Sequence, residues 1–294
     1  MASNSANAAM TRAKLFDLKG RVALVTGGGS GIGLMATQAL VSNGAKVYIT
    51  GRTKEKLEKV AKQYSEGKES IIPIECDVSD KSQIANLVKE IESREKCLCI
   101  LVNNAGISGN TLQTEAESAS EMKKNLFDND KSTFEDWTDV YRTNVAQIYF
   151  MTTAFLPLLQ QSSERHPGWS GTVINISSIS GLVKTAQHHF QYNASKAAAI
   201  HLTRMLSSEI AGNKLKVRVN SIAPGVFPSE MTTDGSGEDQ KSSIPKDQFE
   251  GKVPAGRPGK DEDMAQSILF FAANQYLNGQ TVAVDGGYTI MAGE

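Results

Sequence analysis

A tyrosine and a lysine four residues apart, Tyr192 and Lys196, are the residues whose types and spacing most directly suggest chemistry. On an α-helix, residues at positions i and i+4 lie on the same face, one turn apart. A free phenol with a pKa of about 10 exchanges protons poorly at neutral pH, and an adjacent ammonium lowers that pKa. The pair therefore predicts a proton donor if the fold brings a substrate to it. The alternative is an ordinary surface helix.

A glycine-rich segment, TGGGSGIG at residues 26–33, joins an apolar run at 21–26 to a helical pattern. Glycines permit a tight turn and let a diphosphate approach the peptide N–H groups at a helix N-terminus. The segment is not a P-loop, because no Lys-Ser/Thr pair follows its last glycine. It also fails strict G-x-G-x-x-G, because Ile32 stands at the third glycine position. We interpret it as a nucleotide-binding turn; a flexible turn without a ligand is the alternative.

The residues after the second strand bear on the choice of nucleotide. NAD-binding folds place an acid about 20 residues beyond the glycines, where it binds the ribose 2′-hydroxyl. Here that strand ends in Thr50-Gly51-Arg52-Thr53, and the next acid is Glu55. Because Arg52 suits a 2′-phosphate by charge and geometry, the sequence predicts NADP(H) rather than NAD(H). A solvent-exposed turn residue is the alternative interpretation of Arg52.

Strand and helix patterns alternate along most of the chain. Apolar, β-rich runs predict strands at 21–26, 46–50, 71–75, 98–102, 172–176, 215–222 and 280–284, and helical patterns lie between most of them, notably at 81–93, 134–160, 191–211 and 261–273. This alternation indicates βαβ units. It predicts an α/β fold of the Rossmann type, a doubly wound parallel sheet flanked by helices.

One domain is expected from residue 19 to residue 294, preceded by a disordered leader at 1–18. The leader lacks the apolar core of a secretory signal; an organellar transit peptide is the alternative, and the cytoplasm is the expected location. Two polar stretches, 108–133 and about 226–252, read as an insertion and a loop. In the insertion, residues 114–126 can form a short surface helix. Both stretches follow strand ends, where such sheets bind ligands.

The composition excludes several classes of protein. The 294 residues carry 31 basic and 32 acidic side chains, so no net charge attracts nucleic acid or an anionic membrane. No apolar run approaches the roughly 20 residues that span a bilayer. The three cysteines form no C-x-x-C pair, and we expect reduced thiols and no metal site.

The motifs together resemble the short-chain dehydrogenase/reductase family. In order and approximate spacing they are TGGGSGIG (26–33), CDVS (76–79), NNAG (103–106), Asn144, ISSISG (176–181), YNASK (192–196) and APG (223–225). The resemblance covers residues 19 to 288. Two further segments, 224–232 and 253–265, look most like the rhamnolipid-type 3-oxoacyl reductases and their fungal relatives.

This resemblance implies a set of cofactor-binding residues. Asp77 and Val78 would bracket the adenine, Asn104 would lie against the adenosine ribose, and Ile32 would contact the nicotinamide side. Val226 and Ser229 would hold the carboxamide and diphosphate, with Ser229 standing where the family more often has Thr. The full expected set is Gly27, Gly29, Ser30, Gly31, Ile32, Gly33, Arg52, Asp77, Val78, Asn104, Ala105, Gly106, Tyr192, Lys196, Pro224, Gly225, Val226 and Ser229.

The resemblance also implies a catalytic set of Asn144, Ser178, Tyr192 and Lys196. Tyr192 would protonate the substrate oxygen, and Lys196 would lower its pKa and hold the nicotinamide ribose. Ser178 would hydrogen-bond the oxygen as charge develops there, and Asn144 would fix a water that relays protons. Ser177 is the alternative serine; Ser178 is chosen because it stands three residues before Gly181.

Two departures from the family pattern concern the substrate. The segment from Gly181 to Tyr192 is about one residue longer than is usual in the family, which predicts a bulge. The 108–133 insertion is also longer than usual. His188 and His189 lie in that segment. A solvated loop pair is expected, with substrate contact as the alternative; no acid or cysteine stands beside them to complete a metal site.

The expected function is NADPH-dependent reduction of a ketone to a secondary alcohol, of 3-oxoacyl or secondary-metabolite type. The alternatives are an NAD-dependent alcohol dehydrogenase and a cofactor-binding protein without redox turnover. The expected partners are a small carbonyl or alcohol substrate and further copies of the chain. A homodimer or homotetramer is expected because helices 134–160 and 191–211 carry apolar surface beyond one face.

Overall fold

Seven parallel strands form one sheet in the order β3-β2-β1-β4-β5-β6-β7. The computed structural model describes residues 7–233, 235–245 and 253–292. The strands are β1 (Val22–Thr26), β2 (Lys46–Gly51), β3 (Ile71–Glu75), β4 (Ile100–Asn103), β5 (Gly171–Ile176), β6 (Val217–Pro224) and β7 (Thr281–Val284). The order reverses between β1 and β4, which makes this a doubly wound sheet with its switch point there. The predicted fold class is therefore confirmed.

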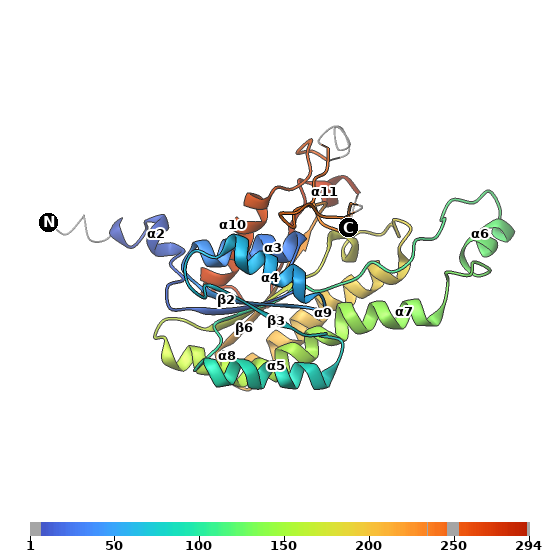
Figure 1. Ribbon diagram of the computed structural model, residues 1–294. Coiled ribbons are helices and arrows are strands. Elements are labelled where there is room, and N and C mark those ends of the chain that lie inside the picture. Colours follow the sequence, from blue (N-terminus) through green and yellow to red (C-terminus); the bar gives the residue numbers. More distant parts are fainter. Residues whose placement is uncertain (1–6, 234, 246–252, 293–294) are drawn as a thin grey trace.

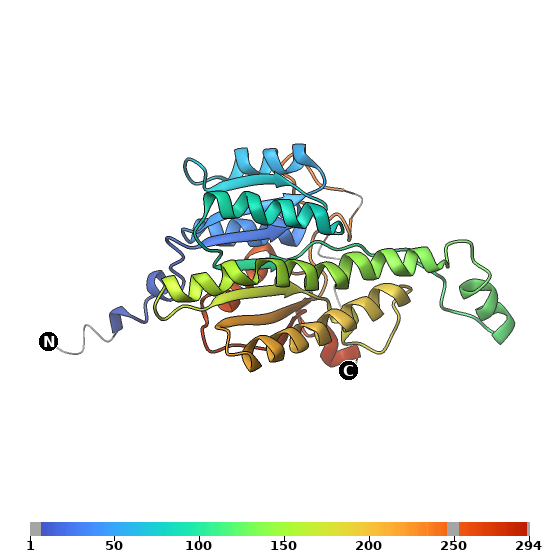
Figure 2. The ribbon, with the colours of Figure 1, turned by 90° about the horizontal axis from the view of Figure 1, so that it is seen from below.

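Helices cover both faces of this sheet (Figure 1). The longer ones are α3 (Gly31–Ser42), α4 (Lys54–Tyr64), α5 (Lys81–Arg94), α8 (Gln147–Arg165), α9 (Phe190–Gly212) and α10 (Asp261–Ala273). Helices α3, α4 and α10 lie on one face, and α5, α8 and α9 lie on the other (Figure 1); Figure 2 looks onto the face that carries α5, α8 and α9. Because both faces are covered, the central strands β1, β4, β5 and β6 are buried along their whole length.

Two hydrophobic layers follow from the alternation of side chains along the strands. Val25, Ile49 and Val102 face one layer with α3 and α10, whereas Leu24 and Leu101 face the layer with α5 and α8. The register places Val25 beside Ile49 and Val102 on neighbouring strands. Each layer excludes water from one face of the sheet. The packed strands therefore hold in place the residues that follow their carboxyl ends.

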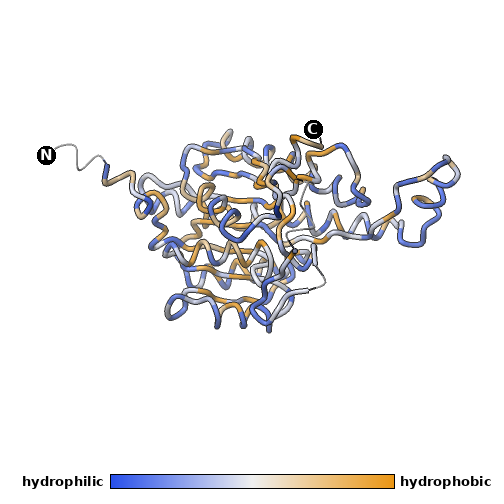
Figure 3. Tube along the Cα trace, turned by 90° about the horizontal axis from the view of Figure 1, so that it is seen from above, coloured by the Kyte–Doolittle hydropathy of each residue, from blue (hydrophilic) through white to orange (hydrophobic). Residues whose placement is uncertain are grey.

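The polar insertion projects from the body of the molecule as an arm (Figures 1 and 2). It contains α6 (Ala119–Leu126) and leads into α7 (Phe134–Tyr141). Ser118 and Thr133 start these helices, because each hydroxyl accepts a hydrogen bond from the backbone N–H three residues on. The short helix expected within 114–126 is therefore present, and the trace of the arm is coloured mostly as hydrophilic in Figure 3.

Three features of the fold were not expected from the sequence pattern. The predicted helix 134–160 is divided by a π-helical turn, Arg142–Ala146, between α7 and α8. Short helices form at α2 (Arg12–Leu15) and α11 (Tyr288–Ala292), and a 3₁₀ turn follows β5 at Ile179–Gly181. Leu18, expected to belong to the leader, is fully buried in the core, so the packed domain includes it.

No helix among the described residues is both long and apolar enough to cross a membrane.

Candidate active site

The carboxyl ends of the parallel strands meet at one edge of the sheet, and the predicted site residues follow them. Gly27 follows β1, Arg52 follows β2, and Asn104 follows β4. A cavity of about 350 Å³ lies at this edge. The predicted residues that line it are Gly27, Gly29, Ser30, Gly31, Ile32, Arg52, Asp77, Val78, Asn104, Ala105, Gly106, Ser178, Tyr192, Lys196, Pro224, Gly225 and Ser229. Such an edge is where doubly wound sheets bind nucleotides.

The glycine-rich turn is held in place by hydrogen bonds from Asn104, the residue after β4. The Asn104 side chain donates to the carbonyl oxygens of Thr26 and Gly27 at 2.9 and 3.2 Å, and the Asn104 N–H donates to Thr26 Oγ1 at 2.9 Å. A Cβ at Gly33 would lie 2.0 Å from the Gly27 oxygen, so only glycine fits there. Gly33 does not line the cavity; it allows the helix to pack against the turn that does.

The two residues that suggested chemistry lie on α9 and both reach the cavity. Lys196 is 4% exposed, and its ammonium lies 5.6 Å from the centre of the Tyr192 ring. Lys196 Nζ donates to the Ile176 carbonyl oxygen, at the end of β5, at 3.0 Å. Within the described residues the ammonium makes this one hydrogen bond, so two of its three N–H groups remain for a ligand.

Burial shifts the pKa of both groups. It lowers the pKa of Lys196 to about 8, because the charged form loses its hydration. It raises the pKa of the Tyr192 phenol, and the neighbouring Ser178 hydroxyl acts in the opposite direction to a smaller extent. Burial is the larger of the two causes, so the net shift of the Tyr192 pKa is upward, whereas the resemblance implied that Lys196 would lower it.

The structure distinguishes the two candidate serines at the end of β5. Ser177 Oγ lies 2.7 Å from Ser221 Oγ and donates to the Ile222 carbonyl oxygen at 2.9 Å, so its hydroxyl is used within the sheet. Ser178 Oγ accepts from the Ser180 N–H at 3.1 Å, which leaves its hydrogen free to donate. Ser178 also interacts with Tyr192. This arrangement favours the predicted choice of Ser178.

Asn144 lies behind the cavity, in the π-helical turn, and is 1% exposed. Its amide donates to the Ile107 carbonyl oxygen at 2.9 Å and to Ser195 Oγ at 3.0 Å, and its oxygen accepts from the Ile107 N–H at 2.9 Å. Both amide hydrogens are thus used, and one oxygen lone pair remains to accept from a water. Asn144 ties the segment after β4 to α9, next to Lys196. Single π-turns are frequent at functional sites.

Some predicted cofactor contacts have other partners in the structure. Val226 lines a separate, smaller cavity of about 150 Å³ beside β7 instead of the main one. Asp77 accepts hydrogen bonds from the N–H and hydroxyl of Ser79 at 2.9 and 2.7 Å, which fixes the turn before α5. Asn104 lines the cavity, but its side-chain amide donates its hydrogen bonds to the glycine-rich turn. These side chains shape the cavity in addition to any contact with a ligand.

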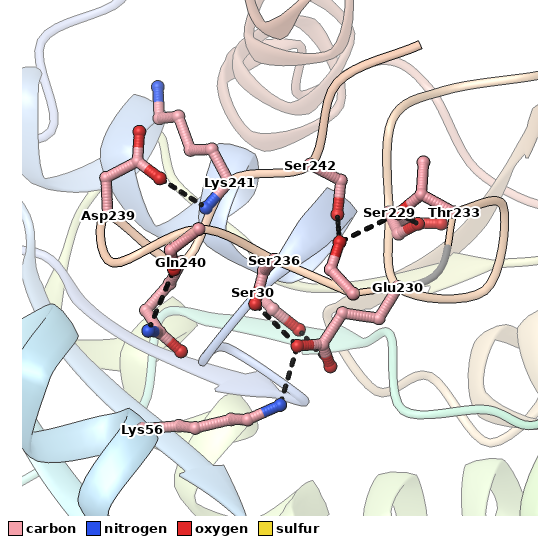
Figure 4. Close-up of polar contacts among 12 residues, drawn as sticks. Ser30, Lys56, Ser229, Glu230, Thr233, Ser236, Asp239, Gln240, Lys241 and Ser242 are labelled. Atoms are coloured by element: carbon pink, nitrogen blue, oxygen red, sulfur yellow. Dashed lines mark hydrogen bonds and ion pairs between the residues drawn. The ribbon is translucent and has the colours of Figure 1, made fainter.

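Two charged residues of the cavity wall were missed by the sequence reasoning, Lys56 and Glu230. They form an ion pair at 2.6 Å between α4 and the segment after β6 (Figure 4). Lys56 stands four residues after Arg52, and Glu230 follows Ser229, so both adjoin predicted residues. Their pairing across 174 residues of sequence had no local signal.

The paired histidines of the 181–190 loop contact the base of the arm. The Leu112 N–H donates to the His188 carbonyl oxygen at 2.9 Å, and His188 Nδ1 lies 3.2 Å from Thr114 Oγ1. Gln187 and His188 adopt positive φ angles of 52° and 66°, consistent with the predicted bulge. The His189 ring packs edge-on against Tyr192 at 6.2 Å, and burial lowers the pKa of His189.

A second cluster of reactive side chains lies at the opposite, amino edge of the sheet. Cys97, Cys99 and His166 place their sulfur and nitrogen atoms within 4.8 Å of one another. Both thiols are buried and reduced, and burial raises the pKa of Cys97 to about 11. His166, whose pKa is lowered by burial and by two neighbouring arginines, completes the group.

The family model for the short chain dehydrogenases matches residues 21–240 of this chain. The chain belongs to the short-chain dehydrogenase/reductase family. The match covers the glycine-rich turn, the Tyr192–Lys196 pair and six of the seven strands. The resemblance inferred from the motifs is therefore confirmed.

Relatives within the family are similar over almost their whole length. The short-chain dehydrogenase/reductase PhomF of Diaporthe leptostromiformis is 40% identical, with 97% of each chain covered. The rhamnolipids biosynthesis 3-oxoacyl-[acyl-carrier-protein] reductase of Pseudomonas aeruginosa is 35% identical, with 93% of this chain and 98% of that protein covered. Among solved structures, the Pseudomonas aeruginosa RhlG/NADP active-site complex superposes with a TM-score of 0.74 at 31% identity, covering 93% of this chain and 98% of that one.

Proposed function

We propose that this short-chain dehydrogenase/reductase uses NADPH to reduce a ketone to a secondary alcohol. One observation carries the proposal: Tyr192, Lys196 and Ser178 line the same cavity as the glycine-rich turn and Arg52. An acid–base group and a nucleotide cradle in one cavity are the two parts that carbonyl reduction requires. The comparisons support it, since a relative is named a 3-oxoacyl reductase and a similar solved structure is a complex with NADP.

The cavity fits a nicotinamide dinucleotide by its glycines and its free donors. A Cβ at Gly106 would lie 3.0 Å from Asn144 Oδ1 and 3.6 Å from Lys196 Nζ, so glycine keeps open the space in front of the ammonium. The two unused N–H groups of Lys196 suit ribose hydroxyls, and exposed Arg52 suits a 2′-phosphate. When bound there, the cofactor supplies the hydride.

The side chains of the site account for the proton. Ser178 Oγ donates a hydrogen bond to the substrate oxygen and stabilises the negative charge that develops on that oxygen as the carbonyl is reduced. Tyr192 Oη transfers its proton to that oxygen, while the carbonyl carbon accepts hydride, so the product is a neutral alcohol. Lys196 stabilises the resulting phenolate by its positive charge. Asn144 keeps the segment before the arm against α9, which fixes Lys196 in place.

A panel of carbonyl compounds with NADPH tests this function, read at the nicotinamide absorbance band. It should include 3-oxoacyl thioesters and cyclic and aromatic ketones, with NADH in parallel. We expect oxidation of NADPH with at least one ketone, and slower oxidation of NADH. Tight binding of NADPH without reduction of any ketone or aldehyde would instead support a cofactor-binding protein without redox turnover.

A further inference from the structure

The Glu230 carboxylate lies within a set of donors that comes from three segments of the chain (Figure 4). Lys56 Nζ and Ser236 Oγ each donate to Oε1 at 2.6 Å, and Ser30 Oγ donates to Oε2 at 3.2 Å. One ammonium and two hydroxyls that converge on one anion form a donor set that would equally suit a phosphate group. The protein therefore contains an anion site that is filled by its own side chain.

This anion site belongs to the cavity wall. Lys56 lies on the first turn of α4, one turn after Arg52, and Ser30 ends the glycine-rich turn before α3. The cavity is lined by Ser30, Arg52, Lys56 and Glu230. Lys56 also passes close to the turn, because its Cβ would be 3.6 Å from a Cβ built on Gly29. The site thus lies between Arg52 and the glycine-rich turn, where the ribose end of a dinucleotide is expected.

A carboxylate in this position opposes an anionic cofactor. The hydrogen bond from Lys56 is the largest cause that holds the pKa of Glu230 below its usual value, so the side chain is charged at neutral pH. Two like charges about 4 Å apart near a protein surface repel by roughly 4 kcal/mol. A phosphate beside Lys56 and the Glu230 carboxylate would therefore exclude each other. Arg52 does not share this conflict, because it is exposed at the rim.

We propose that Glu230 occupies, as an internal anion, the place on Lys56 and Ser30 that the 2′-phosphate of NADP(H) takes when the cofactor binds. Lys56 is then a second cation of the 2′-phosphate site beside Arg52, and Glu230 is a competitor that departs with the loop residues around it. This inference rests on the proposed function. It makes the preference for NADP(H) a balance between two residues, one attracting the phosphate and one occupying its place.

Calorimetric titration of NADP⁺ and NAD⁺ into the purified chain tests the inference without a substrate. Glu230→Gln keeps the shape of the side chain and removes its charge. If the carboxylate occupies the site nine-tenths of the time, its loss should tighten NADP⁺ binding about tenfold. NAD⁺, which lacks the 2′-phosphate, should change by less than about threefold, since nothing displaces Glu230 in that complex.

Lys56→Met provides the complementary variant. It should weaken NADP⁺ binding about tenfold, because one charge-assisted contact to the phosphate is lost, and leave NAD⁺ nearly unchanged. In the double variant, the tighter NADP⁺ binding caused by Glu230→Gln should disappear, because Lys56 is no longer present to bind the 2′-phosphate in place of Glu230. Lys241→Met is the matched control: it removes the 2.5 Å ion pair that joins this loop to Asp261 at the start of α10, and it should alter the binding of neither dinucleotide.

Three results would overturn the inference. Weaker binding of both dinucleotides to Glu230→Gln would mean that the ion pair closes over a bound cofactor. Weaker binding of NAD⁺ alone would mean that Glu230 holds the ribose 2′-hydroxyl. Unchanged binding would mean that there is no competition. Wild-type protein that binds neither dinucleotide would refute the proposed function itself, and thermal denaturation of each variant confirms that the compared proteins are folded.

Discussion

Two buried cations, Lys196 and Arg218, are held in opposite ways on the two faces of the sheet. Arg218 lies near the start of β6 and donates to Ser170 Oγ and to the carbonyl oxygens of Phe271, Ala272 and Leu277, at 3.1 to 3.2 Å. It thereby caps the C-terminal end of α10, whose last carbonyls have no helical partner. Lys196 lies near the end of β5 and donates to one carbonyl oxygen.

The difference separates a cation that supports the fold from one that is kept for a ligand. Burial lowers the pKa of Arg218 to about 10, and that of Lys196 to about 8. Arg218 is compensated by four acceptors and remains charged at neutral pH. Lys196 is compensated poorly, so its burial lowers stability and is explained by its role in the cavity. The amino edge of the sheet is built for stability, and the carboxyl edge for binding.

Removal of the under-compensated cation should lower the activity far more than the stability. Lys196→Met is expected to lower kcat/KM for ketone reduction about 10³-fold, because the phenolate of Tyr192 loses its stabilising charge. The free energy of unfolding should stay the same or rise, since a buried charge is removed. Steady-state kinetics and urea denaturation measure both. Lys62→Met, at an exposed position of α4, is the control and should change neither.

Removal of the compensated cation should have the reverse effect. Arg218→Met is expected to lower the free energy of unfolding by about 3 kcal/mol, because four acceptors lose their partner. The folded fraction should keep its activity, as Arg218 lies away from the cavity. Urea denaturation is the measurement, with exposed Arg204→Met on α9 as control. A loss of activity in fully folded Arg218→Met would remove the distinction between the two edges.

The adjacent serines sharpen the same distinction within two residues. Ser178→Ala should lower kcat about 10²-fold with little effect on stability, because a donor to the substrate oxygen is lost. Ser177→Ala should cost about 1 kcal/mol of stability, because its hydrogen bonds lie within the sheet, and should leave kcat nearly unchanged. Steady-state kinetics and thermal denaturation of the two variants distinguish the two serines. Interchanged effects would mean that Ser177, and not Ser178, donates to the substrate oxygen.

The pH dependence of the reduction tests the state of Lys196. Since its pKa lies at about 8, Lys196 is charged below that pH and loses its charge above it. The reduction rate at saturating NADPH should therefore fall by about tenfold per pH unit above about pH 8. Activity must return when samples are brought back to pH 7, which excludes denaturation. A rate that stays flat to pH 10 would contradict the assignment.

Local patterns predicted most of the fold. The strand at 71–75 and the helix at 261–273 were expected at the bounds that the structure gives. Both depend on nearby residues, since an acidic first turn favours the start of α10. The π-turn at Arg142–Ala146 was missed, because the apolar pattern continues through it and its cause is the packing of Asn144 against α9. The bounds 19–294 also left out Leu18, whose burial depends on distant residues.

The site was predictable where it follows strand ends and unpredictable where it depends on loops. Motifs placed Tyr192, Lys196 and Ser178 at one edge of the sheet because parallel strands end together. The Lys56–Glu230 pair joins segments whose proximity arises only in the fold. The burial that raises the Tyr192 pKa was also not predictable, because burial cannot be judged from a spacing of four residues. The expected oligomer, location and substrate class stay predictions.

Tyr192→Phe tests the central claim most directly, because it removes one oxygen atom and keeps the ring that packs against His189. NADPH binding, followed by fluorescence, and turnover of the best ketone are measured on the same sample. We expect an unchanged dissociation constant for NADPH and a loss of turnover of at least about 10³-fold, since the proton donor is gone. Turnover within a few-fold of wild type, with NADPH bound, would show that Tyr192 is not the acid.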